Sequence, residues 1–432
     1  MADWSRRRFL QLAGLSGAAS LNGCAGIVSK SNSKAHVVVV GGGFGGAIAA
    51  KTLRQLDAGI KVTLIEPKAS YITCPGSNWL FAGLTNIKNL SVDYRALSAD
   101  YGINLVSDSV TRVDAERRRV MVAGGEAIAY DRLVMAPGID FRWDTLPGYG
   151  EASAQIFPHA WQAGPQTLLL QQQIQAMNDG GVVVISVPAE PYRCPPGPYE
   201  RASMIAWWLK QHKPKSKIII LDAKRSFSKQ KLFEAGWAKH FGCGTANSLI
   251  EWQSIADNPL VGLDAQTGTL TTDFGDKIRG QVLNIIPPQQ AGRIARESGL
   301  TDASGWCPVE PQSGRSKFHE TIHVIGDAAH YAPIPKSAFA ANSEAKACAL
   351  AVVALLNGRP LPEVHWLNTC YSLITPRHGI SVAGVYKLDA ERNIGMVKGA
   401  GGVSRLGDEQ AAILEAGYAG GAYLSLVRDS FG

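Results

Sequence analysis

The segment from residue 36 to residue 66 constrains the fold more than any other part of the sequence. Residues 36–40 read HVVVV, an apolar, β-branched run typical of a strand buried on both faces. A glycine-rich turn, a helical stretch over residues 47–56, a second strand over residues 61–65 and an acid, Glu66, follow in that order. This is the residue order of a βαβ unit that binds a dinucleotide. The three glycines of the turn are Gly41, Gly43 and Gly46.

The chemistry of this unit depends on its turn and on its acid. Glycines permit a tight turn and let the backbone approach a pyrophosphate, while the amides at the start of the following helix bind phosphate oxygens. Glu66 is placed to accept hydrogen bonds from ribose hydroxyls. We therefore predict a dinucleotide-binding domain at the start of the folded chain.

Length and composition set the scale of the rest. A chain of 432 residues with 46% hydrophobic residues is long and apolar enough for two or three domains, and it is not disordered. Seven cysteines are an odd number and too few for a disulfide scaffold, so individual cysteines can have separate roles. The net charge is +7, but the arginine runs are short (residues 6–8 and 117–119), which argues against a nucleic-acid partner.

The N-terminus has the order of an export signal, because Arg6, Arg7 and Arg8 precede a short, weakly apolar stretch. Paired arginines before Phe-Leu resemble the twin-arginine signal, so we predict export to the periplasm by that route and a signal peptide over residues 1–26. A basic, disordered N-terminus is the alternative, and lipidation of Cys24 stays open. No other run of 18 apolar residues occurs, which predicts no stable membrane insertion of the mature protein.

Two later strands are predicted to return to the cofactor. Residues 133–138 form a strand and a turn in which Ala136 and Gly138 lie beside the cofactor. Residues 321–327 form a second buried strand that ends at Asp327. The other predicted elements are an antiparallel meander (strands at 104–113, 120–123 and 128–130) and an alanine-rich helix at 337–356.

The second half lacks the glycine turn that a nicotinamide nucleotide needs. Residues 181–187 predict a buried strand, but a proline-rich loop with four prolines between residues 188 and 196 follows it. Prolines remove amide donors and stiffen the backbone, so this loop cannot hold a pyrophosphate. Asp222, after the strand at 217–221, is therefore predicted to be structural. The sequence therefore does not favour NADH as electron donor or acceptor.

The arrangement resembles the two-dinucleotide-domain flavoproteins of the glutathione-reductase-like superfamily. This resemblance implies FAD as the cofactor, Asp327 as a ligand of its ribityl or phosphate groups, and a helix (337–356) that points its N-terminus at the flavin ring. A C-capping glycine followed by a surface aspartate is the alternative for Asp327. Lys336 is expected either to stabilise negative charge on the reduced flavin, and so to be a cofactor ligand, or to be solvated.

Three cysteine segments make the resemblance closer: residues 71–78 (YITCPGSN), 192–203 (YRCPPGPYERAS) and 368–373 (NTCYSL). Over nearly its full length the chain resembles the flavoprotein subunit of flavocytochrome c sulfide dehydrogenase. The implied fold class is α/β, with two Rossmann-like domains, the second without a nucleotide loop, and a C-terminal flavocytochrome c-type interface domain. The predicted boundaries are 35–150 and 286–358 for the two parts of the FAD-binding domain, 151–285 for the second Rossmann-like domain and 359–432 for the C-terminal domain.

The resemblance also implies roles for individual residues. A cysteine at the position of Cys74 forms a thioether to the flavin, although Pro75 replaces the aromatic residue expected next; a small buried thiol is the alternative. Cys194 and Cys370 would form a redox disulfide over the flavin that receives sulfide, rather than a purely structural one. Glu200 is expected either to accept the proton of hydrosulfide or to be an ordinary acid at a helix N-terminus.

The implied activity is an FAD-dependent oxidation of sulfide that passes electrons to a c-type cytochrome. The cytochrome must be a separate chain, because no Cys-x-x-Cys-His motif occurs. A sulfide:quinone reductase is one alternative, although residues 416–427 are short and glycine-rich for a membrane-docking segment; a non-catalytic flavin-binding partner of sulfur-oxidation proteins is another. No role is predicted for Cys243, Cys307 and Cys348, nor any metal site, and a Cys243–Cys307 disulfide stays open.

Overall fold

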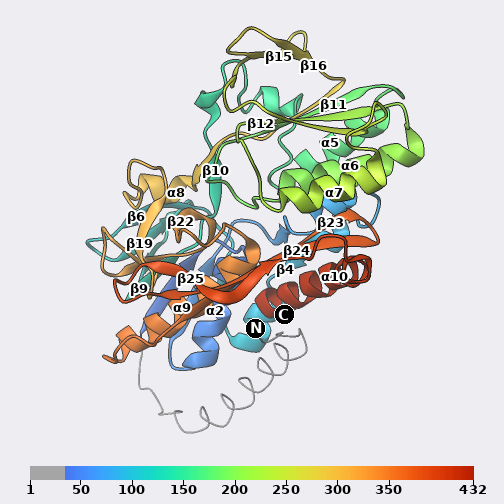
Figure 1. Ribbon diagram of the computed structural model, residues 1–432. Coiled ribbons are helices and arrows are strands. Elements are labelled where there is room, and N and C mark those ends of the chain that lie inside the picture. Colours follow the sequence, from blue (N-terminus) through green and yellow to red (C-terminus); the bar gives the residue numbers. More distant parts are fainter. Residues whose placement is uncertain (1–34) are drawn as a thin grey trace.

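The computed structural model describes residues 35–432. The predicted signal peptide, its arginines and Cys24 lie outside the described residues. Figure 1 shows two α/β units, one above the other. The C-terminal strands and the last helix lie against the lower unit, on the side that faces the upper unit. This mixed α/β architecture agrees with the predicted fold class.

The lower unit is built on an eight-stranded sheet in the order β22-β19-β20-β21-β9-β1-β2-β5. Its central strands are parallel and buried after their first residue, which explains their valine and leucine runs. The strands are β1 (His36–Val40), β2 (Lys61–Ile65), β5 (Asn104–Val106), β9 (Arg132–Met135), β19 (Cys307–Glu310), β20 (Arg315–Ser316), β21 (Ile322–Val324) and β22 (Ala329–His330).

Two long helices pack against each other on this sheet. Helix α2 (Phe44–Leu56) is buried along most of its length, and α9 (Ala338–Leu356) lies beside it. The small alanine side chains of α9 allow this close approach. By length and hydropathy (mean 1.4) α9 is also able to span a bilayer, but 56% of that stretch is buried inside the fold, as expected of a core helix.

The upper unit has a four-stranded parallel sheet in the order β13-β12-β11-β17. Helices α5, α6 and α7 accompany it, and a three-stranded antiparallel sheet (β14, β15, β16) extends from it (Figure 1). The bounds are β11 (Val182–Val187), β12 (Lys217–Asp222), β13 (Ile250–Ser254), β17 (Val282–Ile285), β14 (Leu260–Asp264), β15 (Thr269–Thr272), β16 (Lys277–Arg279), α5 (Pro165–Ala176), α6 (Gly197–His212) and α7 (Gln230–Phe241).

The predicted strand at 104–113 is wrong, because the structure has two strands there. Strand β5 joins the main sheet beside β2, and β6 (Val110–Asp114) belongs to the meander. Between them the Asp108 carboxylate accepts backbone N–H groups of Ser109 at 2.7 Å and of Gly124 at 2.8 Å, which turns the chain. The rest of the meander is β7 (Arg119–Val122) and β8 (Ala127–Ala129), as an antiparallel sheet.

The chain passes between the two units twice. At these two passages the chain forms the strands β10 (Ile139–Phe141) and β18 (Gln289–Ala291), which pair with each other antiparallel. The remaining elements of this half are β3 (Ser70–Ile72), β4 (Ser91–Asp93), α3 (Ile87–Leu90), α4 (Arg95–Tyr101), α8 (Arg293–Glu297) and the 3₁₀ turns at Ser77–Leu80, Trp143–Thr145, Ser153–Gln155 and Gly326–Ala328.

The C-terminal part is an antiparallel sheet followed by a long helix. Strands β23 (His365–Thr375), β24 (His378–Leu388) and β25 (Ile394–Val403) pair in sequence order, and α10 (Glu409–Phe431) packs on β24, β23 and α2. The segment 416–427 therefore lies within a 23-residue helix despite its glycines. Phe431 packs edge-on against Phe44 at 5.3 Å and stacks on Tyr71 at 5.8 Å, which fixes α10 against the first domain.

Candidate functional site

A cavity of about 680 Å³ lies at the carboxyl ends of β1 and β9, where the glycine turn, the cysteine segments and the C-terminal part meet. Open parallel sheets bind ligands at this edge. All the predicted site residues except Gly46 and Lys336 line the cavity: Gly41, Gly43, Glu66, Cys74, Ala136, Gly138, Cys194, Glu200, Asp327 and Cys370.

The glycine turn has the close packing that a dinucleotide loop requires. Gly41 has φ +97°, and a Cβ there would overlap the carbonyl oxygen of Ala136. A Cβ on Gly46 would overlap the carbonyl oxygen of Gly41. Helix α2 begins after Gly43 without a side-chain cap, so its first amides are open to a ligand.

Glu66 lies at the end of β2 and is held against this turn. One of its carboxylate oxygens accepts the backbone N–H of Gly42 at 2.8 Å, and the other accepts that of Lys68 at 3.0 Å. The hydroxyl of Tyr94 donates to the Gly42 carbonyl at 3.0 Å. The carboxylate is therefore fixed at the cavity wall, where the predicted ribose contact requires it.

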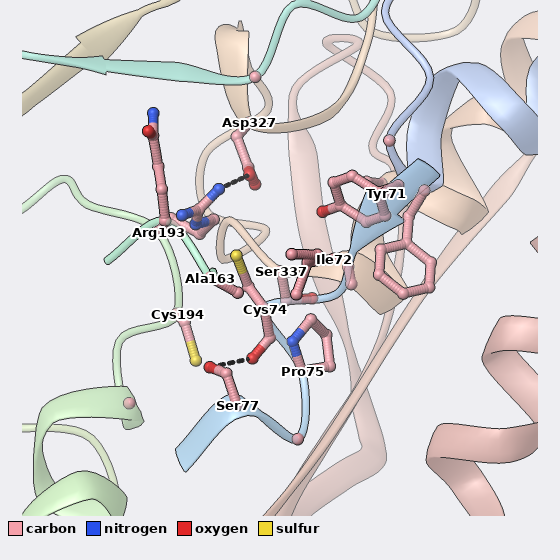
Figure 2. A pocket seen from close by; sticks show the side chains of 18 of the residues that line it. Tyr71, Ile72, Cys74, Pro75, Ser77, Ala163, Arg193, Cys194, Asp327 and Ser337 are labelled. Carbon is pink, nitrogen blue, oxygen red and sulfur yellow. Dashed lines mark hydrogen bonds and ion pairs between the residues drawn. The ribbon is translucent and has the colours of Figure 1, made fainter. Parts of the chain in front are cut away.

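Asp327 provides a direct test of whether a flavin nucleotide fits. Its Oδ1 atom is buried and has no hydrogen-bond partner among the residues that the structure describes. Its Oδ2 atom lies 3.8 Å from the guanidinium of Arg193 (Figure 2). A buried carboxylate oxygen without a donor is costly, and a hydroxyl of a cofactor chain is the group that would satisfy it. The alternative of a surface aspartate is wrong, because the Asp327 side chain is only 15% exposed.

Helix α9 presents its N-terminus to the same cavity. Ser337 caps the helix by accepting the backbone N–H of Ala340 at 3.0 Å, and its hydroxyl donates to Asn368 at 2.7 Å. Ser337, Ala338 and Phe339 line the cavity. The positive end of this 19-residue helix thus faces the cavity in which the superfamily resemblance places the flavin.

The prediction for Lys336 needs correction. Its Nζ atom donates to the backbone carbonyls of Asp327 at 2.8 Å and Ala329 at 2.7 Å, and it lies 3.9 Å from the centre of the Trp306 ring. It is half-buried, and the loss of water contact lowers its pKa to about 8, so the solvated alternative is wrong. The ammonium braces the turn behind Asp327 and is not among the groups that line the cavity, because backbone carbonyls satisfy it there.

Cys74 lies in the loop between β3 and the 3₁₀ turn at Ser77–Leu80. The Ser77 hydroxyl donates to the Cys74 carbonyl at 2.6 Å, which fixes the loop. Figure 2 shows the Cys74 sulfur directed towards the Arg193–Asp327 pair, and its nearest polar contact is the Trp161 carbonyl at 3.9 Å. The thiol therefore faces the cavity rather than the protein core.

The fold brings Cys194 and Cys370 together from separate domains. Cys194 adopts φ +59°, unusual for a residue with a side chain, and is held by bonds from its N–H to the Lys336 carbonyl and from the Gly197 N–H to its own carbonyl, both 2.8 Å. Cys370 lies in β23, opposite Val382 of β24. Both are free thiols that line the cavity, close enough that each is the largest influence on the pKa of the other.

The two thiols of this cysteine pair (Cys194 and Cys370) differ in acidity. The hydrogen bond from Cys194, and to a lesser extent the ammonium of Lys229, lower the pKa of Cys370, while donation to Cys370 and burial raise the pKa of Cys194. The negative charge of the reduced pair therefore belongs on Cys370. The positive charge of Arg193 partly offsets this rise in the pKa of Cys194.

Glu200 lies in the first turn of α6, buried between the cysteine segments. One oxygen accepts the backbone N–H of Leu373 at 2.9 Å and the indole N–H of Trp79 at 3.2 Å, and the other accepts the amide of Asn78 at 3.0 Å. These contacts exceed what an ordinary acid at a helix N-terminus makes. The carboxylate joins three chain segments, and its proximity to the cysteine pair still allows it to act on a proton there.

Sequence reasoning missed three buried cations around the site. Arg201 is 2% exposed, donates to the His159 and Ala160 carbonyls at 3.0 and 2.5 Å, and lies 4.8 Å from the centre of the Trp161 ring. Arg193 stands next to Cys194, so its position in the cysteine loop was a usable signal. Lys229 reaches the site from the upper unit and had no local signal.

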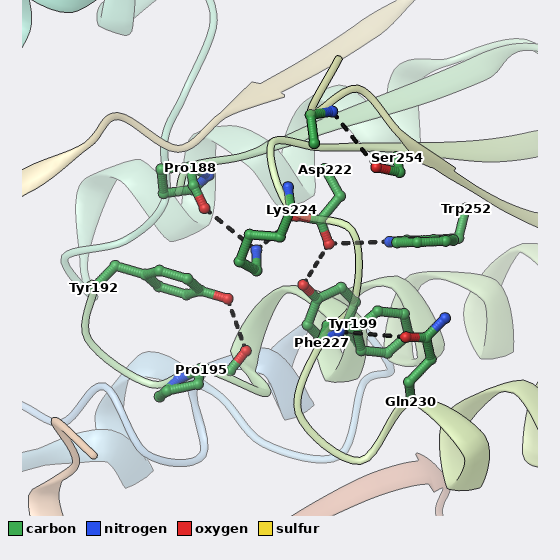
Figure 3. Close-up of polar contacts among 11 residues, drawn as sticks. Pro188, Tyr192, Pro195, Tyr199, Asp222, Lys224, Phe227, Gln230, Trp252 and Ser254 are labelled. Carbon is green, nitrogen blue, oxygen red and sulfur yellow. Dashed lines mark hydrogen bonds and ion pairs between the residues drawn. The ribbon is translucent and has the colours of Figure 1, made fainter. Parts of the chain in front are cut away.

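In the upper unit, the protein's own side chains fill the place at the ends of β11 and β12 where a second nucleotide would bind (Figure 3). Asp222 is fully buried and accepts hydrogen bonds from the Tyr199 hydroxyl at 2.6 Å, the Trp252 indole at 3.0 Å and the Lys224 ammonium at 2.6 Å. The hydroxyl of Tyr192 donates to the Pro195 carbonyl at 2.9 Å within the proline-rich loop. Asp222 is thus structural, as predicted, because its oxygens are already used.

The other cysteines lie away from the cavity. Cys348 is buried in α9 and Cys307 in β19, and burial raises the pKa of each to about 12. Cys243 follows the end of α7 in the upper unit, whereas Cys307 begins β19 of the lower unit, and both are free thiols. The structure therefore does not contain the Cys243–Cys307 disulfide that the sequence left open.

Fold and site together define a class of protein: a two-domain FAD flavoprotein related to the pyridine nucleotide-disulphide oxidoreductases, whose family model matches residues 35–174. Two further models match residues 167–287 and 362–431; they describe the central domain of the sulfide dehydrogenase [flavocytochrome c] flavoprotein chain and the flavin-binding domain of flavocytochrome c sulphide dehydrogenase. A sulfide dehydrogenase [flavocytochrome c] flavoprotein chain from Chlorobaculum thiosulfatiphilum is 69% identical over 43 residues, 90% of that sequence and 10% of this chain. The chain belongs to this family of flavocytochrome c sulfide dehydrogenase flavoprotein chains.

More distant relatives cover more of the chain. The mitochondrial sulfide:quinone oxidoreductase of Dictyostelium discoideum is 23% identical over 323 residues, 72% of this chain and 68% of its own. The solved structure of the sulfide:quinone oxidoreductase from Aquifex aeolicus has a TM-score of 0.67 and 18% identity, and each chain is covered to 92%. That of a putidaredoxin reductase–putidaredoxin complex has a TM-score of 0.65 and 16% identity, with 92% of this chain and 98% of that chain covered. These structures support the fold.

Proposed function

We propose that this chain oxidises sulfide at the cysteine pair and passes the electrons through FAD to a c-type cytochrome subunit, in the oxidising periplasm. The single observation that carries the proposal is the convergence of Cys194 and Cys370, from distant parts of the chain, on the wall of the cavity predicted to hold FAD. Sulfide is the substrate named for the family to which the chain belongs, and two cysteines that can close to a disulfide beside a flavin suit an attack by a small sulfur nucleophile on that disulfide.

The chemistry divides between the protein and the cofactor. In the oxidised form the cysteine pair would be a disulfide; hydrosulfide attacks one sulfur, a new S–S bond forms, and the old one breaks with its electron pair on the other sulfur. FAD, when bound, supplies a two-electron acceptor that can deliver electrons singly. Gly41, Gly46, Glu66 and Asp327 would hold the nucleotide, and Cys74 would attach the flavin covalently.

The protein's own groups prepare the site for this reaction. Arg193 and Arg201 are buried cations at the cavity wall, and they favour an anion such as hydrosulfide there. Cys194 is fixed by its backbone contacts, and Glu200 stands close enough to both cysteines to influence their ionisation. The proline-rich loop and the occupied Asp222 leave the nicotinamide nucleotides without a site, which favours a protein electron acceptor.

A test uses the flavin absorbance of the holoprotein under anaerobic conditions. Sulfide should bleach it in the wild type, and the Cys194→Ser and Cys370→Ser variants should bleach at least about 100-fold more slowly because the covalent route is lost. Cys243→Ser is the matched control, since its thiol lies outside the cavity. Unchanged bleaching in both active-site variants would contradict the proposal, and no bleaching in the wild type would favour a non-catalytic flavin-binding role.

The quinone acceptor is the second candidate, and one observation favours it. Helix α10 exposes a row of apolar side chains of the kind that meets a membrane: Ile413, Leu414, Tyr418 and Leu424. Sulfide-dependent reduction of soluble cytochrome c and of a short-chain ubiquinone should therefore be compared in the same preparation. Faster reduction of cytochrome c supports the proposed acceptor, and faster reduction of the quinone replaces it with the second candidate.

A further inference from the structure

A buried lysine from the upper unit reaches the strand that carries Cys370. Lys229 is the residue before α7, has φ +62° and is only 8% exposed. Its Nζ atom donates to the Ser372 hydroxyl at 2.8 Å and to the Cys370 carbonyl at 3.4 Å. A left-handed backbone at a residue with a long side chain is strained, and the surrounding contacts hold it there. These contacts place the ammonium of Lys229 against residues 370–372 of β23.

Within the part of the chain that the structure describes, Lys229 has no carboxylate as an ion-pair partner. Within residues 35–432 the lysines that form ion pairs are Lys217, Lys224, Lys239 and Lys346. Lys224, five residues earlier, is the instructive contrast, because Asp222 neutralises it at 2.6 Å. A buried ammonium that makes only neutral hydrogen bonds destabilises a fold, so such a group is typical of a site where a negative charge appears during function.

Four ionisable groups act on Lys229 from the elements packed around it: Cys370 first, then Glu200, Cys194 and Glu415. Glu200 is already bound by three donors, and Glu415 accepts the Ser404 hydroxyl at 2.5 Å. Burial lowers the pKa of Lys229, and the charge on Cys370 opposes this more than any other group does. Cys370 is therefore the group whose ionisation is most strongly linked to the lysine.

We propose that Lys229 is the counter-charge for a thiolate on Cys370 and thereby decides which sulfur of the cysteine pair leaves. The proposal rests on the proposed function, since it concerns the same disulfide. Hydrosulfide attacks Sγ of Cys194, the new S–S bond forms there, and the Cys194–Cys370 bond breaks. The electron pair of that bond stays on Cys370 as a thiolate beside the ammonium. The sulfide sulfur is oxidised to the persulfide level, the disulfide is reduced, and no proton has to move in the step.

The physical reason for this direction is the quality of the leaving group. A thiol of lower pKa leaves faster in thiol–disulfide exchange, and a neighbouring cation lowers the pKa of a thiol. Lys229 acts on Cys370 through its charge and the hydrogen bond to Ser372 and makes no contact with a substrate. It is a positioning residue, and its effect must disappear when the charge is removed and return when another cation replaces it.

The first experiment measures ionisation and needs no turnover. In a Cys194→Ser background, the rate of alkylation of Cys370 by iodoacetamide is followed against pH by peptide mass spectrometry. Lys229→Met should raise the midpoint by about one pH unit or more, whereas Lys229→Arg should restore it. Lys231→Met, which removes an exposed charge from the same helix, is the control and should leave it unchanged. An unchanged midpoint in Lys229→Met overturns the proposal.

Thermal unfolding of the same proteins separates this role from a structural one. Lys229→Met replaces a buried charge by an apolar chain of similar length and should melt at or above the wild-type temperature. Lys229→Gln serves as a second neutral variant. If both neutral variants fail to fold while Lys229→Arg folds, the lysine is structural and the proposal is overturned.

The second experiment locates the sulfur after one turnover. Oxidised protein is mixed with one equivalent of sulfide, quenched with an alkylating reagent and digested. One added sulfur atom should be found on the Cys194 peptide, and its presence on the Cys370 peptide instead overturns the assigned direction. Absence of added sulfur from both peptides is a failure of the proposed function, and it is distinguishable because the alkylation midpoint does not depend on sulfide.

Discussion

The carboxylate of Glu200 accepts the backbone N–H of Leu373, 173 residues further along the chain, at 2.9 Å. This bond ties helix α6, which begins just after Cys194, to strand β23, which carries Cys370. The same carboxylate accepts the side chains of Asn78 and Trp79, four and five residues after Cys74. One buried group therefore sets the relative positions of all three cysteine segments.

Substitution Glu200→Gln should lower stability and disturb the site together. Glutamine offers one acceptor oxygen where glutamate offers two, so a buried donor from Asn78, Trp79 or Leu373 is left without a partner. We expect the free energy of unfolding to fall by about 1–3 kcal/mol, as measured by chemical denaturation. Sulfide-dependent bleaching should slow by less than about 100-fold.

The same variant distinguishes a positioning role from proton transfer. Loss of a general base costs typically ~10²–10⁴ in rate with little effect on stability. A decrease of that size at unchanged stability would show that Glu200 is the base. Glu297→Gln, which breaks an exposed ion pair with Arg293 on α8, is the control and should change neither quantity measurably.

Gly46→Ala should abolish flavin binding, because its Cβ would overlap the Gly41 carbonyl oxygen and force the turn open. The matched control is Gly45→Ala on the same turn of α2, whose Cβ meets its nearest neighbour, Ile325, at an ordinary 3.7 Å. The ratio of visible flavin absorbance to protein absorbance measures the outcome. Full flavin content in Gly46→Ala, or equal loss in both variants, would show that the turn does not hold the nucleotide.

Cys74→Ser should convert a covalently held flavin into a removable one. The Cys74 sulfur faces the cavity, so a thioether to the cofactor is geometrically open to it. After acid precipitation the flavin should stay with the wild-type protein and appear in the supernatant of the variant. Cys243→Ser should behave as the wild type. Release of flavin from the wild-type protein would show that the link is absent.

Acid should destabilise the protein partly through His323, which is fully buried in β21. Its Nδ1 atom bonds the Ser313 carbonyl at 2.9 Å, its Nε2 atom has no partner among the described residues, and burial lowers its pKa to about 4. Because the unfolded chain binds this proton near pH 6.5, stability is full above that pH and falls between about pH 6.5 and 4.

The variant His323→Asn isolates this contribution, because its amide can still donate to Ser313 but does not titrate. The loss of unfolding free energy between pH 7 and pH 4 should be smaller in the variant by up to roughly 3 kcal/mol, as measured by denaturation at each pH. Equal losses in both proteins would assign the acid sensitivity to other groups, such as His159 and His240.

Features that depend on neighbours along the chain were predictable from the sequence. The β1–glycine turn–α2–β2–Glu66 unit has a local signature, since each residue type meets a requirement of its own backbone position. The missing second turn was equally local, because four prolines within residues 188–196 remove amide donors that a phosphate loop needs. Asp327 followed from the resemblance, and its orphaned oxygen agrees with that role.

Lys336 and Glu200 show where such reasoning failed. Lys336 lies next to the predicted ligand in sequence, but its long side chain turns away to two carbonyls and a ring. Glu200 was placed as a local helix acid, whereas its partners come from the segments around residues 78 and 373. A side chain's direction depends on what packs around it, and the local sequence does not contain that information.

The sequence by itself determined the nucleotide-binding unit, the closed second site and the three cysteine segments that carry the family resemblance. The resemblance paired Cys194 with Cys370, but only the tertiary structure showed that both line one cavity and that Lys229 lies against the strand of Cys370, because these contacts join strands and loops from different domains. Their geometry follows from packing across the interface between β23, α6 and α7. Local propensity acts over a few residues, and no local signal extends across that interface.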